Sequence, residues 1–193
     1  MSSYTYMYRI NKQKENKVAV LAKFGESIFH ADDLANLWQI ENKHILYITL
    51  SRYTKKEILF RIYKGFYSLK PLNEIDPFIL GSKAIHSYCY LSTEAILSEA
   101  GIIQQKVDKI TFIGDKSKNF KIGKYFYSER RLKDEFLYNP AGIIDDNGVK
   151  KATTARAIAD LLYFNPHYFF DAKDLINWKE VSGMQKKVGY PLT

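Results

Sequence analysis

The sequence predicts an α+β protein built from two domains, and two observations support this prediction. Residues 17–70 combine helical periodicity with the signature of a hairpin. A short stretch bounded by prolines then separates them from a second series of strand-like and helix-like segments. Because a chain of 193 residues is long enough for two small domains, we place the domains at residues 1–72 and 83–193, joined by a linker at residues 73–82.

The first domain is expected to contain three helices. A short helix at residues 17–24 ends before Gly25, a residue type that readily takes the left-handed conformation that closes a helix. A short strand at residues 27–30 precedes the second helix, at residues 31–38. The third helix is expected at residues 42–57.

The third predicted helix has two chemically different faces. Leu46, Leu50 and Tyr53 lie on one arc of the helical wheel and are expected to face the core. The opposite face is polar, basic and aromatic. It comprises His44, Ile48, Ser51 and Lys55, flanked by Tyr47 and Arg52.

A hairpin is predicted immediately after this helix. Residues 58–62 and 66–69 are rich in β-forming residues, and the tip between them contains Lys64 and Gly65. Pro71 then ends the hairpin. After its short first helix, the first domain is therefore predicted to contain a second helix, a basic third helix and a hairpin, in that order.

The positive charge of the chain is concentrated in this part of the first domain. The formal net charge is +8, and residues 43–70 contain seven basic residues with Glu57 as their single acidic residue. Such an excess favours a polyanionic partner, although charge alone leaves DNA, RNA and a membrane surface as alternatives.

Three helices with a basic third one, followed by a two-stranded hairpin, are typical of a winged helix-turn-helix domain. Such a domain places the second helix of the pair in the major groove and its hairpin along the DNA backbone. We therefore expect double-stranded operator DNA as the partner, with bases read by His44, Tyr47, Ser51 and Arg52. The residues expected to contact phosphate are Lys43, Lys55, Lys56, Arg61 and Lys64. The alternative is a solvated basic helix face beside an unrelated hairpin.

A small mixed α/β fold is predicted for the second domain. One helix, at residues 94–100, is expected to be capped by Ser92 or Thr93. Residues 145–148, with the sequence Asp-Asp-Asn-Gly, form a strong turn signal. The other expected elements are helices at 77–85, 155–164 and 171–179 and strands at 88–91, 109–113, 120–122 and 124–128.

The sequence contains no recognisable catalytic constellation. Its four histidines lie far apart at spacings unlike those of zinc sites, and it has neither a nucleophile elbow nor a phosphate-binding loop motif. Residues 114–118 are interpreted as a polar turn, and the aromatic residues are expected to fill two cores rather than to form a base-stacking platform. We therefore expect no enzyme activity, catalytic residue, cofactor or metal, with a small enzyme acting on nucleic acid as an alternative.

Composition indicates a soluble protein of the cytoplasm. Hydrophobic residues at 46% and charged residues at 26% are typical of globular proteins and exclude a disordered chain. No window approaches the roughly 18 apolar residues of a membrane span, and the N-terminus lacks the apolar stretch of a signal peptide. The lone Cys89 forbids an intrachain disulfide, fits a reducing compartment and is expected to be a buried thiol.

Residues 46–53 (LYITLSRY) and 62–69 (IYKGFYSL) resemble the recognition helix and the wing of AbiEi-type antitoxins. Farther along the chain, three segments are similar to that family's strand–helix–glycine segment, to the strand that follows it and to a late helix. In this order they are residues 90–103, 107–113 and 152–163.

The resemblance implies an antitoxin of a type IV toxin–antitoxin, or abortive-infection, system. A member of this family represses its own promoter at inverted repeats, and its C-terminal domain supports antitoxicity and cooperative repression. Its functional partner is a nucleotidyltransferase toxin, with which it forms no stable complex. The alternative is a protein-interaction module, in which residues 83–193 directly bind and neutralise a toxin or another partner.

Overall fold

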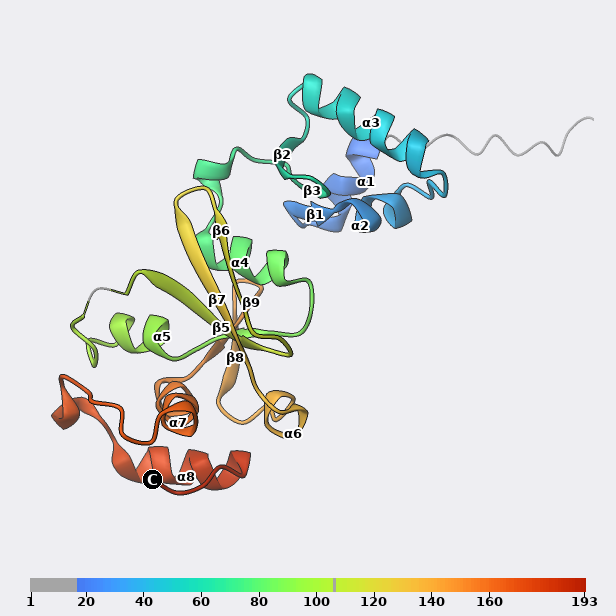
Figure 1. Ribbon diagram of the computed structural model, residues 1–193. Helices are drawn as coiled ribbons and strands as arrows, with labels where there is room; N and C mark the ends of the chain where they lie inside the picture. The colour runs from blue at the N-terminus through green and yellow to red at the C-terminus, as the bar shows by residue number, and fades with distance from the viewer. Residues whose placement is uncertain (1–16, 106) are drawn as a thin grey trace, which may run out of the picture. The chain divides into compact units, whose positions relative to one another are not determined.

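Two β-sheets, one of three strands and one of six, organise the chain in the computed structural model, which describes residues 17–105 and 107–193 (Figure 1). The chain divides into an N-terminal unit, Met1–Glu74, and a C-terminal unit, Ile75–Thr193. Each unit combines helices with one of the two sheets. The predicted α+β class is therefore confirmed.

The N-terminal unit places three helices around its small sheet. The helices are α1 (Lys17–Phe24), α2 (Ala31–Leu37) and α3 (Lys43–Lys55), and the strands are β1 (Ile28–His30), β2 (Phe60–Tyr63) and β3 (Phe66–Ser68). The strand order is β1-β3-β2, and both pairings are antiparallel. The sheet therefore ties the β2–β3 hairpin to the strand that leads directly into α2.

Local sequence sets the start of α3 and the turn of the hairpin. The Asn42 side chain accepts hydrogen bonds from the backbone N–H groups of His44, at 2.9 Å, and Ile45, at 3.2 Å. Gly65 has a φ of +86° in the β2–β3 turn, a conformation that a residue with a Cβ rarely adopts. The predicted third helix and hairpin are both confirmed.

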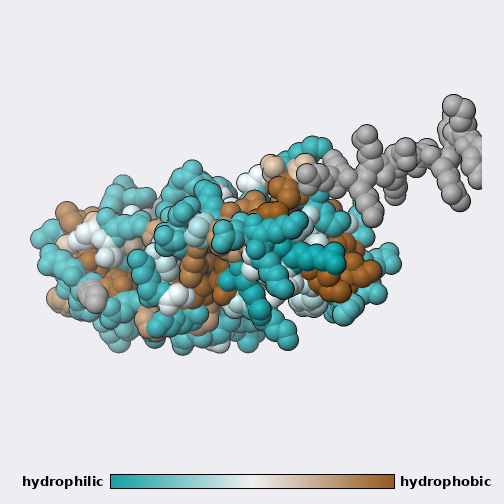
Figure 2. Space-filling view, turned by 90° about the horizontal axis from the view of Figure 1, so that it is seen from above, coloured by the Kyte–Doolittle hydropathy of each residue, from teal (hydrophilic) through white to brown (hydrophobic). Residues whose placement is uncertain are grey.

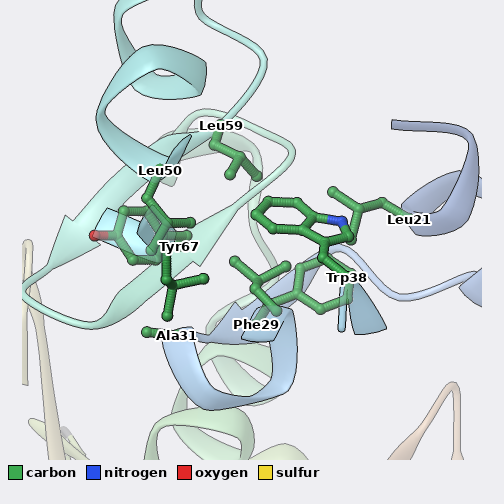
Figure 3. Packing of buried hydrophobic residues seen from close by; sticks show 9 residues of the cluster. Leu21, Phe29, Ala31, Trp38, Leu50, Leu59 and Tyr67 are labelled. Carbon is green, nitrogen blue, oxygen red and sulfur yellow. The ribbon is translucent and has the colours of Figure 1, made fainter. Parts of the chain in front are cut away.

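A small apolar core fixes which face of α3 points outward (Figure 3). Leu46 and Leu50 of α3 are buried in it, together with Leu34 and Trp38. The Trp38 ring meets the Tyr53 ring edge to face, with 5.5 Å between the ring centroids. Because these residues hold the inner arc of α3, the opposite arc is left at the surface.

The C-terminal unit is built on the six-stranded mixed sheet, with the order β6-β7-β5-β4-β9-β8. The pairs β5–β7 and β4–β9 are parallel, and the other pairs are antiparallel. Its strands are β4 (Tyr90–Leu91), β5 (Lys109–Gly114), β6 (Lys118–Ile122), β7 (Tyr125–Arg131), β8 (Ile143–Asp146) and β9 (Val149–Ala152). Its helices are α4 (Pro77–Ile85), α5 (Glu94–Glu99), α6 (Asp134–Leu137), α7 (Thr154–Phe164) and α8 (Trp178–Val188).

Helices cover both faces of this sheet (Figure 1). Gly81 of α4 lies directly against the rings of Phe112 and Tyr127 on one face. Successive residues of a strand point to opposite faces, and Arg130 of β7 accordingly meets Glu94 of α5 on the other. Helices α7 and α8 pack together on that second side.

Helix α4 occupies much of the segment that the sequence assigned to a linker. The Asp76 side chain accepts hydrogen bonds from two backbone N–H groups of the first turn, and Pro77 stands at the first helical position. The helix therefore begins at Pro77. Of the expected 73–82 linker, residues 77–82 are helical and belong to the C-terminal unit.

Two local predictions for the C-terminal unit are wrong. Thr93 precedes α5 with a φ of +56° and makes no capping hydrogen bond, while the Ser92 hydroxyl donates to the Asp160 carboxylate at 2.8 Å. The helix expected at 171–179 is a single 3-10 turn, and α8 begins only at Trp178 because the side chain of Asn177 caps it. The short helix α6 was not predicted at all.

Candidate nucleic-acid interface

The outward face of α3 carries most of the residues that the sequence singled out. All nine predicted DNA-binding residues have exposed side chains in the N-terminal unit. They are Lys43, His44, Tyr47, Ser51, Arg52, Lys55, Lys56, Arg61 and Lys64. Exposure of hydrogen-bonding and cationic side chains on one helix and the adjoining hairpin is the arrangement that contact with a nucleic acid requires.

A groove of about 340 Å³ runs between α3 and the β2–β3 hairpin. It is lined by Tyr47, Ser51, Thr54 and Lys55 of α3 and by Arg61, Lys64 and Tyr67 of the hairpin. Five of the nine predicted residues therefore line one concave surface. Lys43, His44, Arg52 and Lys56 lie outside this lining, along the rest of α3 and just after its end.

The groove presents positive charge without neutralising carboxylates. Within the part of the chain that the structure describes, no ion pair involves Lys55, Arg61 or Lys64. Burial raises the pKa of the Tyr67 phenol, whereas the positive charge of Arg61 opposes that rise. Tyr67 is therefore a neutral hydroxyl beside a guanidinium, a combination that can bind the oxygens of a phosphate.

Two apolar side chains interrupt the polar surface of α3. Ile45 is 54% exposed and Ile48 is 39% exposed. In a DNA interface such side chains contact the methyl group of thymine in the major groove. One face of the molecule is seen in Figure 2, where hydrophilic residues predominate and hydrophobic residues form separate patches.

Sequence reasoning missed three residues of this surface. Thr54 follows Tyr47 by seven positions, so helical periodicity could have placed it on the groove side of α3. Tyr67 is paired directly with Arg61 across the hairpin, but it was not recognised because the register of the two strands was unknown. Ile45 gave no signal, because a large aliphatic residue has no functional group that marks it as a binding residue.

The strongest polar network of the C-terminal unit is buried rather than exposed. Arg156 and Asp160 have no exposed surface, and the Arg156 Nε–H donates to Asp160 Oδ1 at 2.8 Å. Asp160 also accepts hydrogen bonds from the Ser92 and Tyr190 hydroxyls, at 2.8 Å and 2.7 Å. The Arg156 Nη atoms donate to the Tyr90 hydroxyl and to three backbone carbonyl groups.

This buried network has the character of a structural element. Burial raises the pKa of the Tyr90 and Tyr190 phenols, and the nearby Asp160 carboxylate raises it further. Both hydroxyls therefore remain neutral donors or acceptors within the core. Perturbed pKa values can also mark reactive sites, but every nitrogen that Arg156 uses and both oxygens of Asp160 are already engaged inside the fold.

Other site types find little support in the described residues. Residues 17–105 and 107–193 contain no group of three or more His, Cys, Asp or Glu side chains able to hold a metal ion. Within the same ranges, no helix has the length and apolar character needed to cross a membrane. Cys89 is buried as predicted, and burial raises the pKa of its thiol to about 11.

Comparison with known proteins identifies a fold relative but no family. No family model and no curated protein matches the chain. The structure is similar to the crystal structure of the RV2827C protein from Mycobacterium tuberculosis, with a TM-score of 0.53 and 14% sequence identity. The match covers 90% of this chain and 70% of that chain. At this level of identity, the likeness shows a shared fold alone.

Proposed function

We propose that the N-terminal unit is a winged helix-turn-helix domain that binds duplex DNA. In this proposal α2 and α3 form the helix pair, α3 enters the major groove, and the β2–β3 hairpin is the wing. The groove between α3 and the hairpin is the observation that carries the proposal, because it gathers Lys55, Arg61 and Lys64 beside four hydroxyl groups. The hydroxyl groups belong to Tyr47, Ser51, Thr54 and Tyr67.

In the proposed binding mode, the groove and the exposed arc of α3 contact different parts of the DNA. Lys55, Arg61 and Lys64 neutralise phosphates along one side of the major groove, and the released counterions supply much of the affinity. The exposed arc of α3 faces base edges, where His44 and Arg52 supply hydrogen bonds and Ile48 contacts thymine methyl groups. Affinity then comes mainly from the protein groove between α3 and the hairpin, and sequence preference comes from the exposed arc of α3.

The resemblance to AbiEi-type antitoxins extends the proposal to a biological role. We infer that the protein is a transcriptional repressor of its own operon, that it acts at inverted repeats and that it counteracts a nucleotidyltransferase toxin. We expect inverted repeats, of the kind found in AbiEi operators, upstream of the gene that encodes this protein. This role rests on residues 46–53, 62–69 and the three later segments, whereas DNA binding rests on the groove.

A titration of labelled duplexes tests the proposal directly. We expect the full chain to bind the region upstream of its own gene more tightly than a random duplex of the same length and composition. The logarithm of the binding constant should fall with the logarithm of salt concentration by about 0.9 for each phosphate neutralised. Equal affinity for both duplexes would contradict the repressor role, and no binding to either would contradict the proposed domain function.

A protein-interaction role is the second candidate, and one observation favours it. Residues 169–178 of the C-terminal unit expose three large apolar side chains, namely Phe169 at 65%, Leu175 at 64% and Trp178 at 43%. Exposed apolar side chains of this size commonly contact a partner. Co-purification with the product of the neighbouring gene distinguishes the two candidates, because a type IV antitoxin is expected to form no stable complex with its toxin.

A further inference from the structure

One face of the large sheet carries an aromatic residue between two lysines. Phe126 of β7 is paired with Lys121 of β6 on one side and with Lys109 of β5 on the other. Residues at paired positions in neighbouring strands point to the same face of a sheet. All three side chains are exposed, and Phe126 retains 47% of its surface. The row Lys109–Phe126–Lys121 is therefore a basic and aromatic surface.

The lysines of this row are free to meet an anion. Lys121 places its Nζ 4.6 Å from the centre of the Phe126 ring, and no described carboxylate forms an ion pair with Lys109, Lys121 or Lys124 of the adjoining turn. Lysines on an edge strand can simply prevent unwanted strand pairing. That explanation fits β6, which is an edge strand, but not Lys109, because β5 is an inner strand.

The same face continues into a hollow of about 370 Å³. The next row in register is Asn119, Ser128 and Thr111, and Ser128, Thr111, Lys109 and Arg130 all line the hollow. A volume of this size accommodates a small ring system such as a nucleobase. The hydroxyls of Ser128 and Thr111 can donate or accept hydrogen bonds at the edge of such a ring.

Glu94 supplies a second acceptor in this hollow. Its Oε1 accepts a hydrogen bond from Arg130 at 2.6 Å, while its Oε2 is buried and has no hydrogen-bond partner among the described residues. A buried carboxylate oxygen without a donor is costly, because it has lost its water. Because this oxygen is covered by the fold, a donor on a base reaches it only when the Glu94 side chain turns toward the hollow.

We propose that this face of the C-terminal unit binds single-stranded nucleic acid. One base stacks on Phe126 and displaces the Lys121 ammonium from above the ring, and a neighbouring base enters the hollow. Lys109, Lys121 and Lys124 bind the phosphates. Stacking on a sheet-borne aromatic with flanking lysines is how many single-strand binding proteins hold their ligand without reading its sequence. A duplex does not fit this mode, because its bases are already stacked and their faces are covered. The site is separate from the α3 groove and does not depend on it.

The experiment measures fluorescence anisotropy of labelled oligothymidine and oligouridine of about 10 nucleotides, a typical length for one such site. The protein is the full chain carrying Arg61→Ala and Lys64→Ala, so that the proposed duplex site is weakened. Phe126→Ala should reduce affinity about 5- to 100-fold, and Phe126→Tyr should retain it, since tyrosine also stacks. Lys109→Gln and Lys121→Gln should each lower the salt slope by about 0.7.

Controls separate stacking from general attraction to a polyanion. Tyr138→Ala removes another aromatic residue of the C-terminal unit, 57% exposed and outside both rows, and should leave the affinity unchanged. Circular dichroism melting verifies that each variant is folded. If Phe126→Ala binds as tightly as Tyr138→Ala, or if only the lysine variants weaken binding, the proposal is overturned.

Discussion

The cations of the groove in the N-terminal unit and the buried Arg156 of the C-terminal unit have opposite roles. In the N-terminal unit, Lys55, Arg61 and Lys64 line an open groove and form no ion pair within the described chain. In the C-terminal unit, Arg156 is completely buried, and its guanidinium is surrounded by the Asp160 carboxylate, the Tyr90 hydroxyl and backbone carbonyls.

This difference separates groups that bind from groups that hold the fold together. An exposed cation contributes little to stability, because water and salt screen it. A buried cation is tolerated only where the fold satisfies it, and removing one partner leaves the other desolvated and unpaired. Substitutions in the groove should therefore change binding and spare folding, whereas substitutions in the buried network should have the reverse effect.

Arg156→Ala is expected to have the largest effect. It leaves Asp160 buried without its counterion and should lower the free energy of unfolding of the C-terminal unit by about 3–5 kcal/mol. Urea denaturation followed by tryptophan fluorescence measures this, because Trp178 belongs to the C-terminal unit and Trp38 to the N-terminal unit. A Trp38→Phe background leaves Trp178 as the single tryptophan, so the transition then reports on the C-terminal unit.

The matched control is Arg131→Ala, which removes an exposed arginine of the same unit and should change stability by less than about 0.5 kcal/mol. If Arg156→Ala also cost no more than this, the network would be dispensable for folding. The contrast between the two kinds of charge would then be lost.

Gly81→Ala should have the second largest effect, because the interior of the C-terminal unit is closely packed. A Cβ at this position would lie 2.5 Å from Cε1 of Tyr127 and 2.7 Å from Cε2 of Phe112. Neither ring can move freely, so we expect a loss of about 1–3 kcal/mol in thermal or urea unfolding.

Gly183→Ala tests the same substitution without the clash. Gly183 lies within α8, and a Cβ there would meet nothing within 4 Å. Alanine is the better helix former, so this variant should be more stable by about 0.5–1 kcal/mol. Equal destabilisation by Gly81→Ala and Gly183→Ala would show that the close contacts of α4 with the sheet do not account for the cost of the Gly81 substitution.

The groove should respond in binding rather than in folding. Arg61→Ala and Lys64→Ala should each lower the salt slope for duplex DNA by about 0.9, with unfolding curves unchanged. Lys133→Ala is the control, because this lysine is 69% exposed in the C-terminal unit and lies outside the groove. An unchanged slope in both groove variants would remove these residues from the interface.

The sequence was most informative where local signals determine the structure. The apolar arc of α3 and the Gly65 turn are local features, and the third helix and the hairpin were predicted from them. Asn42 was expected to be the first helical residue and is instead the cap of α3. The same pattern indicated which side chains are exposed. Positions set by tertiary contacts were not accessible, as Tyr67 shows: its place in the groove depends on its pairing with Arg61.

Long-range contacts explain one error and one omission in the C-terminal unit. Ser92 has the residue type of a helix cap, but its hydroxyl is drawn to Asp160, which lies far along the sequence. The row formed by Lys109, Phe126 and Lys121 was missed for a similar reason, since it comes from the register of three strands. Aromatic composition predicted filled cores, and Phe126 departs from that expectation, as do Phe24 and Phe169.

Ile48→Ala should give the smallest effect and the sharpest test of what α3 faces. Ile48 is already exposed, so its loss should leave the unfolding free energy within about 0.5 kcal/mol. If its side chain is buried against a thymine methyl group in the complex, affinity for the preferred duplex should fall by about 1 kcal/mol, which is a fewfold change. Ile144→Ala, which removes an isoleucine 52% exposed in the C-terminal unit, should leave that affinity unchanged. Competition titrations against the preferred duplex resolve the difference. Equal affinities for the two variants would mean that Ile48 does not contact DNA.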